Sequence, residues 1–307
     1  MKKTLCLILS LLFCTSCFTA CASGNDNGAG QSTTTQSTTV TTTASTTAST
    51  APVVQNRGEL SVLFVGNSYT YYNDLPTAIF EKIAAAAGYE PYIIAITGAG
   101  HNLYQHASPT DVCGARVTKE LLPKNVYIYD YVVLQEQSMR PASDDLATFY
   151  DAVRDLSGRA KGIEATPILY STWGRHSSSD YLTQTGLTNE TMTWKLAASY
   201  TAIAEELDIP VGYVGLAFYE VYTGDSGIEL YDPDFTHPSY AGSYLAAMTL
   251  FAKMTGLDPT TVNFNGELSA EDAAVLKQAA KNAVFNTPEI PEEYRTSSVG
   301  VTNIKGE

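Results

Sequence analysis

The hydrophobic and polar positions of this chain predict short buried strands separated by amphipathic helices. From residue 58 onward, apolar runs of about five residues alternate with stretches in which apolar residues recur at helical spacing. Runs of this kind, bounded by turn residues and followed by helices, indicate parallel βαβ units. The five runs are SVLFV (61–65), YIIAI (92–96), YVVLQ (131–135), PILYS (167–171) and PVGYV (210–214).

Helices are expected after each run, and the alternation predicts an α/β fold. We expect a three-layer α/β/α sandwich built on a five-stranded parallel sheet. Ligands bind at the carboxyl ends of the strands in such sheets, so Ser68, Gly98–Gly100 and Gln135–Ser138 should meet in one place. The helices are expected near residues 76–87, 117–122, 144–156, 194–207 and 239–255, with one more that opens at the capping-box pattern of residues 269–272.

The segments around this pattern divide the chain further. Residues 1–21 combine two lysines, an apolar stretch and small residues, which is the layout of a secretory signal peptide. Residues 22–57 are almost wholly Ser, Thr, Gly, Asn and Ala, and they offer too little apolar surface to offset their ordering entropy. We therefore predict a flexible linker there, a folded domain over residues 58–288 and a C-terminal tail over residues 289–307.

The end of the signal peptide resembles a bacterial lipobox. In Phe18-Thr19-Ala20-Cys21, Phe18 stands where Leu is usual, and Cys17 is a competing cysteine. The resemblance implies that Cys21 is lipidated and becomes the new N-terminus. The protein would then be exported and anchored on the outer face of the cell membrane, touching the membrane only through its lipid. The alternative is simple secretion.

Composition and charge narrow the choice of partners. With 44% hydrophobic residues the chain has the composition of a globular protein. A formal net charge of -14 argues against nucleic acid as a partner, because nucleic acids are polyanions. Four of the five cysteines lie within residues 1–21, so the exported domain keeps only Cys113 and cannot form an internal disulfide. Cys113 is expected to be a buried small apolar residue.

A serine, a histidine and an aspartate form a candidate catalytic set. A serine hydroxyl such as that of Ser68 is a weak nucleophile until a neighbouring base takes its proton. His237 follows Asp234 by three residues in a loop, so the carboxylate could hold one imidazole tautomer and leave the other nitrogen as a base. The structural alternative is that Ser68 caps a helix and Asp234 makes a turn. Residues 66–70 lack the second glycine of the α/β-hydrolase elbow, which disfavours that fold.

Four stretches resemble, in order, the four blocks of the SGNH (GDSL-like) hydrolase superfamily, and the resemblance covers about residues 60–260. It implies a flavodoxin-like α/β/α sandwich that hydrolyses acyl esters. It assigns Ser68 as nucleophile, His237 as base and Asp234 as the acid that orients it. STWGR (171–175) and PVGYVGLAF (210–218) are similar to a largely uncharacterised bacterial branch. The four blocks are VLFVGNSYT (62–70), GAGHNL (98–103), VVLQEQS (132–138) and DFTHP (234–238).

The same resemblance implies an oxyanion hole made by the backbone N–H groups of Ser68 and Gly100 and a side-chain amide of the third block. Two blocks depart from the family pattern. Asn67 replaces the usual aspartate and should still shape the turn through hydrogen bonds. In the third block Gln137 falls at the position of the family's asparagine. Gln135 remains the alternative donor, because residues two apart on an extended chain point to the same side.

These observations predict an exported serine esterase acting on acyl esters, acetyl esters among them, of small molecules or carbohydrates. The alternative is a non-catalytic cell-surface module that binds glycans on the same fold. No cofactor and no metal are expected.

Weaker candidates also have structural explanations. Gly98-Ala99-Gly100 lacks the third glycine of a dinucleotide loop. His101 and His106 are expected at the surface or in packing roles, because no His/Cys cluster has ligand spacing. The aromatic residues Tyr69, Tyr71, Tyr72 and Trp173 could form a platform for a sugar ring or belong to the core.

Overall fold

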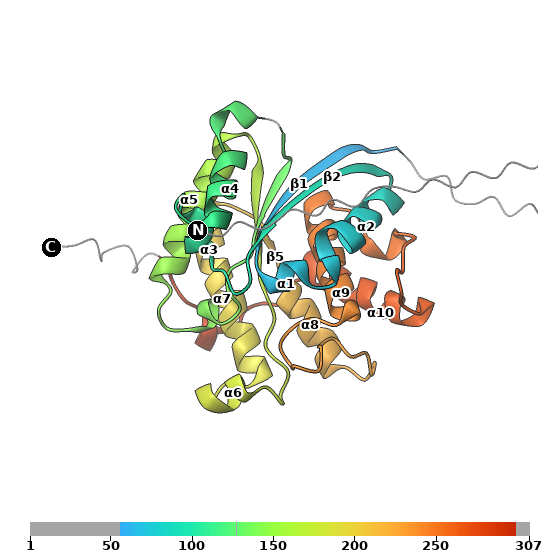
Figure 1. Ribbon diagram of the computed structural model, residues 1–307. Helices are drawn as coiled ribbons and strands as arrows, with labels where there is room; N and C mark the ends of the chain where they lie inside the picture. Colours follow the sequence, from blue (N-terminus) through green and yellow to red (C-terminus); the bar gives the residue numbers. More distant parts are fainter. Residues whose placement is uncertain (1–55, 127, 299–307) are drawn as a thin grey trace, which may run out of the picture. The chain divides into compact units, whose positions relative to one another are not determined.

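A five-stranded parallel sheet lies at the centre of the fold (Figure 1). The computed structural model describes residues 56–126 and 128–298. The strand order is β2-β1-β3-β4-β5, and every neighbouring pair is parallel. Each predicted run contains a strand, although in 210–214 only Val211 and Gly212 are strand and Val214 already begins a helix, and the predicted α/β fold class is confirmed. The strands are β1 (Gly58–Gly66), β2 (Tyr89–Thr97), β3 (Tyr131–Leu134), β4 (Thr166–Tyr170) and β5 (Val211–Gly212).

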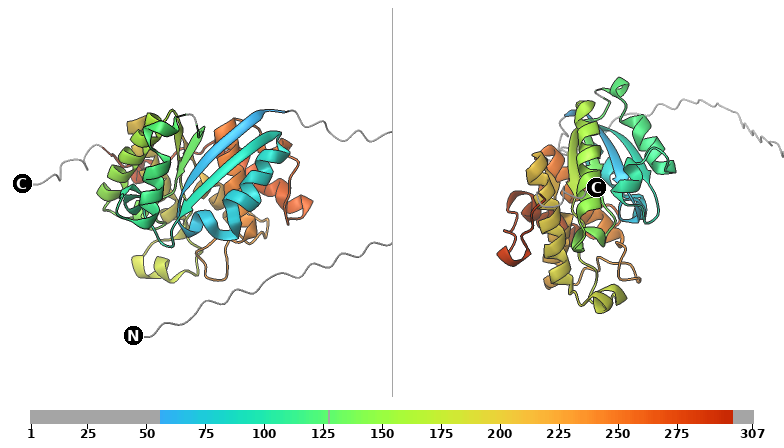
Figure 2. Two further views of the ribbon diagram at one scale, coloured as in Figure 1. Left: turned by 45° about the horizontal axis from the view of Figure 1, so that its top comes forward. Right: turned by 90° about the vertical axis from the view of Figure 1, so that its left-hand side faces the viewer.

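Helices cover both faces of the sheet, and the two groups flank the strands in Figures 1 and 2. Two short helices, α1 (Ser68–Tyr71) and α6 (Asp180–Thr185), lie in the connections that follow β1 and β4, and a π-helical segment over Leu75–Phe80 leads into α2. One face carries α2 (Glu81–Ala86), α8 (Val214–Thr223), α9 (Tyr240–Thr255) and α10 (Ala270–Phe285). The other face carries α3 (Leu103–Ala107), α4 (Val112–Glu120), α5 (Ala147–Gly162) and α7 (Asn189–Leu207).

The residues of β1 show why this sheet needs helices on both sides. Val62 and Phe64 pack into the core under α9 and α10, whereas Leu63 and Val65 pack into the core under α5 and α7. Successive side chains of a strand point to opposite faces, so an unbroken apolar run requires two apolar layers. This burial holds the carboxyl end of β1 in a fixed position.

Gly66 ends β1 where the chain passes close to β3. A Cβ atom at this position would lie 2.5 Å from Gln135 Oε1 and 2.5 Å from Thr70 Oγ1. No larger residue fits without moving these groups. The glycine therefore lets the end of β3 approach the turn that carries Ser68.

The described part of the predicted tail lies against α5 and α7. Ser298 is buried, and its carbonyl accepts a hydrogen bond from Arg154 Nη2 of α5 at 3.3 Å. A cavity of about 350 Å³ lies between α7 and residues 287–296. Packing thus continues beyond the predicted domain boundary at residue 288.

Several sequence predictions fall on residues that the structure does not describe. The signal peptide, the lipid attachment at Cys21 and the linker as far as residue 55 lie outside the described residues, as do residues 299–307. Within residues 56–126 and 128–298, no helix has both the length and the apolar character needed to cross a bilayer.

Candidate active site

Ser68 is the first residue of α1, immediately beyond the carboxyl end of β1. Asn67 caps this helix, because its Oδ1 accepts a hydrogen bond from the Tyr69 N–H at 3.1 Å. The Asn67 Nδ2 group donates to the carbonyl of His101 at 2.8 Å. Asparagine in place of the family's aspartate therefore shapes the turn by hydrogen bonds, as expected, and also ties it to the loop after β2.

Ser68, His237 and Asp234 form a continuous hydrogen-bonded series. His237 Nε2 lies 2.8 Å from Ser68 Oγ, and His237 Nδ1 lies 2.5 Å from Asp234 Oδ2. A carboxylate can only accept, so Nδ1 carries the proton and Nε2 is left to accept the serine hydroxyl. The structure thus brings Ser68 at the end of β1 together with a loop whose His237 is 169 positions further along the chain.

The Asp234 carboxylate is held in its charged form. Partial burial would raise its pKa, but hydrogen bonds from the His237 side chain and from the backbone of His237 and Thr236 outweigh burial and lower the pKa below its ordinary value. The backbone N–H groups of Thr236 and His237 both donate to Asp234 Oδ1 at 2.9 Å. Each carboxylate oxygen therefore has its own partners.

Aromatic rings support the imidazole, and three of the four predicted platform residues, Tyr69, Tyr71 and Tyr72, line the cavity beside Ser68. Tyr72 stacks on His237 with ring centres 4.1 Å apart, and Tyr72 and Tyr71 line the cavity beside Ser68. Tyr69 is nearly fully buried at the cavity floor and stacks at 4.3 Å on Trp173, which is buried and does not line the cavity. A sugar platform that includes Trp173 is therefore wrong, because its ring lies within the core.

The candidate oxyanion donors face a cavity of about 320 Å³ that is lined by Ser68, Gly100, Gln137 and His237 among others. Within the described residues, the backbone N–H groups of Ser68 and Gly100 have no hydrogen-bond partner. Gly100 has a φ of +66°, in the left-handed region that favours glycine. Both amides are thus available to a group that enters the cavity.

Gln137 and Gln135 differ in their surroundings, which separates the two candidates for the third donor. Gln137 lines the cavity, and its Oε1 accepts hydrogen bonds from the backbone N–H groups of Met139 at 2.9 Å and Arg140 at 3.2 Å. These contacts fix its amide group while no described residue pairs with its NH2. Gln137 is therefore placed to donate into the cavity.

Gln135 is fully buried below the serine turn. Its Oε1 accepts from the Asn67 N–H and from Thr70 Oγ1, each at 2.9 Å, and its Nε2 donates to the carbonyl of Glu136. Strand alternation alone left both glutamines open, and β3 ends at Leu134, so the two candidates are separated by their surroundings. Gln135 supports the turn and does not face the cavity.

Glu136 is a buried carboxyl group that the sequence patterns did not single out. Its Oε1 accepts from the Gln137 N–H at 2.6 Å, and its Oε2 accepts from the Leu103 N–H at 3.1 Å. Burial raises the pKa of Glu136 to about 7, and these hydrogen bonds and Arg140 offset part of the rise. Glu136 thus joins the Gln137 loop to the loop that follows Gly100. A charged residue at the end of an apolar run was the only sequence signal for it.

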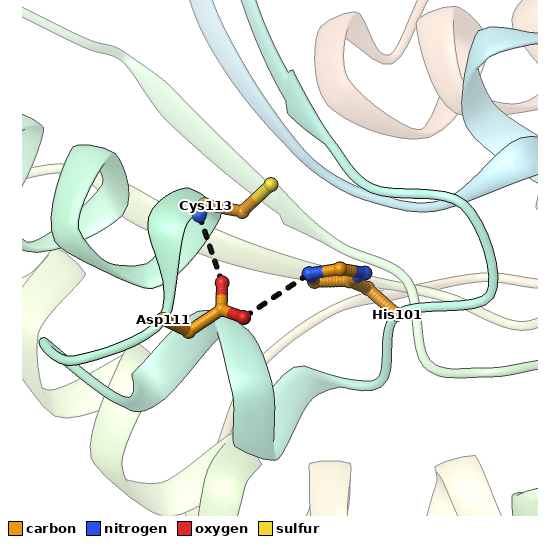
Figure 3. Close-up of side chains that lie close together, drawn as sticks. All are labelled: His101, Asp111 and Cys113. Atoms are coloured by element: carbon orange, nitrogen blue, oxygen red, sulfur yellow. Dashed lines mark hydrogen bonds and ion pairs between the residues drawn. The ribbon is translucent and has the colours of Figure 1, made fainter. Parts of the chain in front are cut away.

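His101, Asp111 and Cys113 form a side-chain cluster that spacing along the chain did not reveal (Figure 3). Their potential ligand atoms lie within 4.8 Å of one another. Asp111 Oδ2 lies 3.3 Å from His101 Nε2, while Asp111 Oδ1 caps α4 by accepting from the Cys113 N–H at 2.8 Å. Cys113 is partly exposed, not buried as expected, because it sits in the first turn of α4. The cap and the ion pair account for these contacts.

His106 has a packing role, as the sequence suggested. It is buried, and its Nε2 lies 2.8 Å from the carbonyl of Gly66, to which it donates. Burial lowers the pKa of His106 to about 4, so the ring is neutral near pH 7.

Comparisons with solved structures connect this geometry to known proteins. A candidate SGNH hydrolase from Slackia heliotrinireducens is 30% identical, with a TM-score of 0.54, over 64% of this chain and 99% of that chain. A DUF4886 family protein from Bacteroides uniformis is 17% identical, with a TM-score of 0.60, over 79% of this chain and 99% of that chain. At 17% identity the second likeness concerns the fold alone.

A weaker likeness links the fold to a variant of an acetyl xylan esterase from Geobacillus stearothermophilus. It is 16% identical, with a TM-score of 0.44, over 64% of this chain and 96% of that chain, and at this level it supports no inference about substrate. No family model matches the chain, and no curated protein matches it in sequence.

Proposed function

We propose that this chain, which belongs to the SGNH hydrolase family, is a serine esterase that cleaves acyl esters. Family membership rests on 30% identity to the Slackia protein across 99% of that chain. The observation that carries the proposed activity is the series Ser68 Oγ, His237 Nε2 and Asp234, with spacings of 2.8 Å and 2.5 Å beside an open cavity. A serine that merely capped a helix would need neither the histidine nor the aspartate.

In the proposed first step, Ser68 Oγ attacks the acyl carbonyl carbon while His237 Nε2 takes the hydroxyl proton. The Asp234 carboxylate stabilises the imidazolium that results. The oxyanion of the tetrahedral intermediate accepts hydrogen bonds from the N–H groups of Ser68 and Gly100 and from the Gln137 amide. His237 then gives its proton to the leaving alcohol, and the acyl group stays on Ser68.

In the second step, water attacks the acyl-enzyme while His237 takes one of its protons. The same donors stabilise the second tetrahedral intermediate, and its collapse releases the carboxylic acid as Ser68 regains its proton. Every proton transfer uses the Nε2 atom that faces Ser68.

The substrate class that we propose is a short acyl ester, such as an acetyl ester, of a small-molecule or carbohydrate alcohol. The cavity of about 320 Å³ is near the lower end of the usual size for ligand sites. Tyr71 and Tyr72 along its lining offer aromatic surface on which the alcohol part could lie.

The test is a screen of p-nitrophenyl esters and acetylated sugars with the wild-type protein, Ser68→Ala and His237→Ala. Each substitution should lower kcat by roughly 10⁶-fold, because members of such a unit fail together. A fluorophosphonate probe should label wild-type Ser68. Ser226→Ala, in an exposed turn outside the cavity, is the matched control and should keep full activity. Full activity in Ser68→Ala would refute the proposal, and sugar binding without any labelling would instead indicate a glycan-binding module.

A further inference from the structure

Arg175 places an unpaired positive charge in the candidate active site. It follows β4 in STWGR and lines the same cavity as Ser68 and His237. Within the described residues, Arg175 forms no ion pair with a carboxylate. Its Nε is buried and has no hydrogen-bond partner among residues 56–126 and 128–298. A buried donor without a partner is costly, so a group that satisfies it on entering the cavity would be favoured.

The Arg175 side chain is held in position by its neighbours. Its guanidinium carbon lies 4.6 Å from the centre of the Tyr181 ring, a cation–π contact. The backbone that carries this side chain is fixed separately, because the Arg175 carbonyl accepts a hydrogen bond from Asn189 Nδ2 of α7 at 2.9 Å. Burial raises the pKa of Tyr69 at the floor of the cavity, and the charge of Arg175 opposes that rise. Because Arg175 also lines the cavity, its charge lies beside a ligand that enters there.

The remaining lining does not neutralise this charge. The other side chains around the cavity are aromatic, amide, hydroxyl or small, apart from His237. Asp234 lies behind His237, and its two carboxylate oxygens are used by the imidazole and by the backbone. The chain as a whole has a formal net charge of -14 and therefore repels anions. A local positive charge such as that of Arg175 is where an anion would be attracted.

We propose that the substrate is an ester that carries a carboxylate close to the scissile bond, and that Arg175 binds this carboxylate. The planar fork of guanidinium donors matches a carboxylate and is stronger than a neutral hydrogen bond. The carboxylate belongs either to the alcohol part, as in an acylated uronic acid, or to the acyl part, as in a monoester of a dicarboxylic acid. This inference rests on the proposed esterase function and narrows its substrate class.

The experiment uses two matched pairs of esters with the full chain. Monomethyl succinate against methyl succinamate tests a carboxylate in the acyl part, and acetoxyacetate against acetoxyacetamide tests one in the alcohol part. In at least one pair, the wild-type protein should prefer the charged member. Arg175→Gln should lower kcat/KM for that member by roughly tenfold to a hundredfold more than for its amide partner. Arg175→Lys should restore part of the preference, because it keeps the charge without the fork.

Arg295→Gln is the matched control, since it also removes one positive charge. Arg295 lies outside this cavity and pairs with Glu292 at 3.0 Å, so the preference should not change. The inference is overturned if hydrolysis depends on Ser68 but neither pair shows a preference for the charged member. It is equally overturned if Arg175→Gln lowers both members of a pair alike.

A binding measurement separates this inference from the esterase proposal. If no ester is hydrolysed in a Ser68-dependent way, the esterase proposal fails. Titration calorimetry with sodium succinate and sodium glycolate on Ser68→Ala, and on the same variant with Arg175→Gln, still tests the anion site. Binding that is lost with Arg175 supports the site, and absence of binding to Ser68→Ala overturns it.

Discussion

Asp234 uses both of its carboxylate oxygens, which makes it difficult to replace. Oδ2 accepts from the imidazole of His237, and Oδ1 accepts from two backbone N–H groups. Asparagine has one acceptor oxygen, so its NH2 would face either the imidazole or the backbone donors. We expect Asp234→Asn to lower kcat by on the order of 10⁴-fold by favouring the wrong imidazole tautomer, as steady-state kinetics would show.

Asp232→Asn is the matched control two residues earlier. Asp232 contacts His237 through its backbone N–H, which donates to the His237 carbonyl at 2.8 Å and is unaffected by the substitution. Burial and the nearby charge of Asp234 raise the pKa of Asp232. Activity should change little in this variant. Equal losses in the two variants would mean that negative charge near the loop matters and the hydrogen bond does not.

Gln137→Ala removes the amide that faces the cavity. Loss of one oxyanion donor typically lowers kcat by ~10²–10³, with little change in KM because the contact strengthens only in the transition state. We expect this pattern for Gln137→Ala in steady-state kinetics on a p-nitrophenyl ester. A thermal melt should show a small effect on stability, because only the turn contacts to Met139 and Arg140 are lost.

Gln135→Ala should instead act through the fold. It leaves the Asn67 N–H and the Thr70 hydroxyl without their acceptor in a buried place, at a cost of roughly 1–3 kcal/mol for each unsatisfied group. Its melting temperature should fall by several degrees. A stable but inactive Gln135→Ala together with a fully active Gln137→Ala would exchange the two assignments.

The sequence predicts the roles of some of these residues and not of others, and the difference has a physical cause. Ser68 and the Asp234/His237 pair stand at recognisable places, a strand end and a short loop, so their meeting at one edge of the sheet could be expected. The choice between Gln137 and Gln135 could not be predicted, because it depends on which distant groups each side chain contacts. The isolation of Arg175 likewise depends on tertiary neighbours, since no local pattern tells whether an arginine has an acid beside it.

At the scale of elements, Asp258 joins the end of α9 to α10. Its carboxylate caps the turn over Pro259–Thr261 and lies 2.6 Å from Lys281 of α10. Hydrogen bonds from Lys281 and Thr260 lower the pKa of Asp258 to about 2. Because the folded pKa is below the unfolded value, the stabilisation is present above about pH 4 and is lost as the pH falls toward 2.

Asp258→Asn should therefore lower Tm at pH 7 and should matter less in acid. The side chain is about one third exposed, so we expect about 1 kcal/mol or less, equivalent to roughly 2–4 °C. Thermal melts at pH 7 and pH 3 would show whether the difference from wild type narrows. Asp144→Asn removes a fully exposed partner of Lys195 and should change Tm at neither pH. A difference for Asp258→Asn that is equal at both pH values would contradict the ion pair as its source.

The elements themselves were largely predictable, because buried strands and amphipathic helices have different periods. Four of the apolar runs lie almost wholly in strands, the run 210–214 forms only the two-residue β5, and the helix expected at residues 194–207 lies within α7. The helix expected at 117–122 begins earlier, at Val112, because Asp111 caps it. Its first turn packs closely on the preceding loop, since a Cβ atom at Gly114 would lie 2.0 Å from the Ser108 carbonyl oxygen. The packing of residues 289–298 had no periodic signal, since it depends on contacts with distant helices.

At the scale of the whole molecule, lipid attachment at Cys21 stays a prediction from residues 18–21, which lie outside the described part of the chain. If it is correct, the folded domain is held at a membrane surface. Because the chain has a formal net charge of -14, it gains no attraction from anionic lipid headgroups. All membrane affinity would then come from the lipid. One acyl chain gives only marginal, reversible binding, whereas several chains give stable anchoring.

Cys21→Ser in the full-length protein tests this, with Cys17→Ser as its matched control four residues earlier. Fractionation of producing cells should place the wild-type protein and Cys17→Ser with membranes, resistant to high salt because no ion pairs hold them there. Cys21→Ser should shift to the soluble fraction or remain unprocessed. Mass spectrometry of the wild-type protein should find Cys21 as the N-terminal residue, with the lipid attached to it. Loss of membrane association in Cys17→Ser but not in Cys21→Ser would move the attachment site, and a wild-type protein found wholly in the soluble fraction would favour simple secretion.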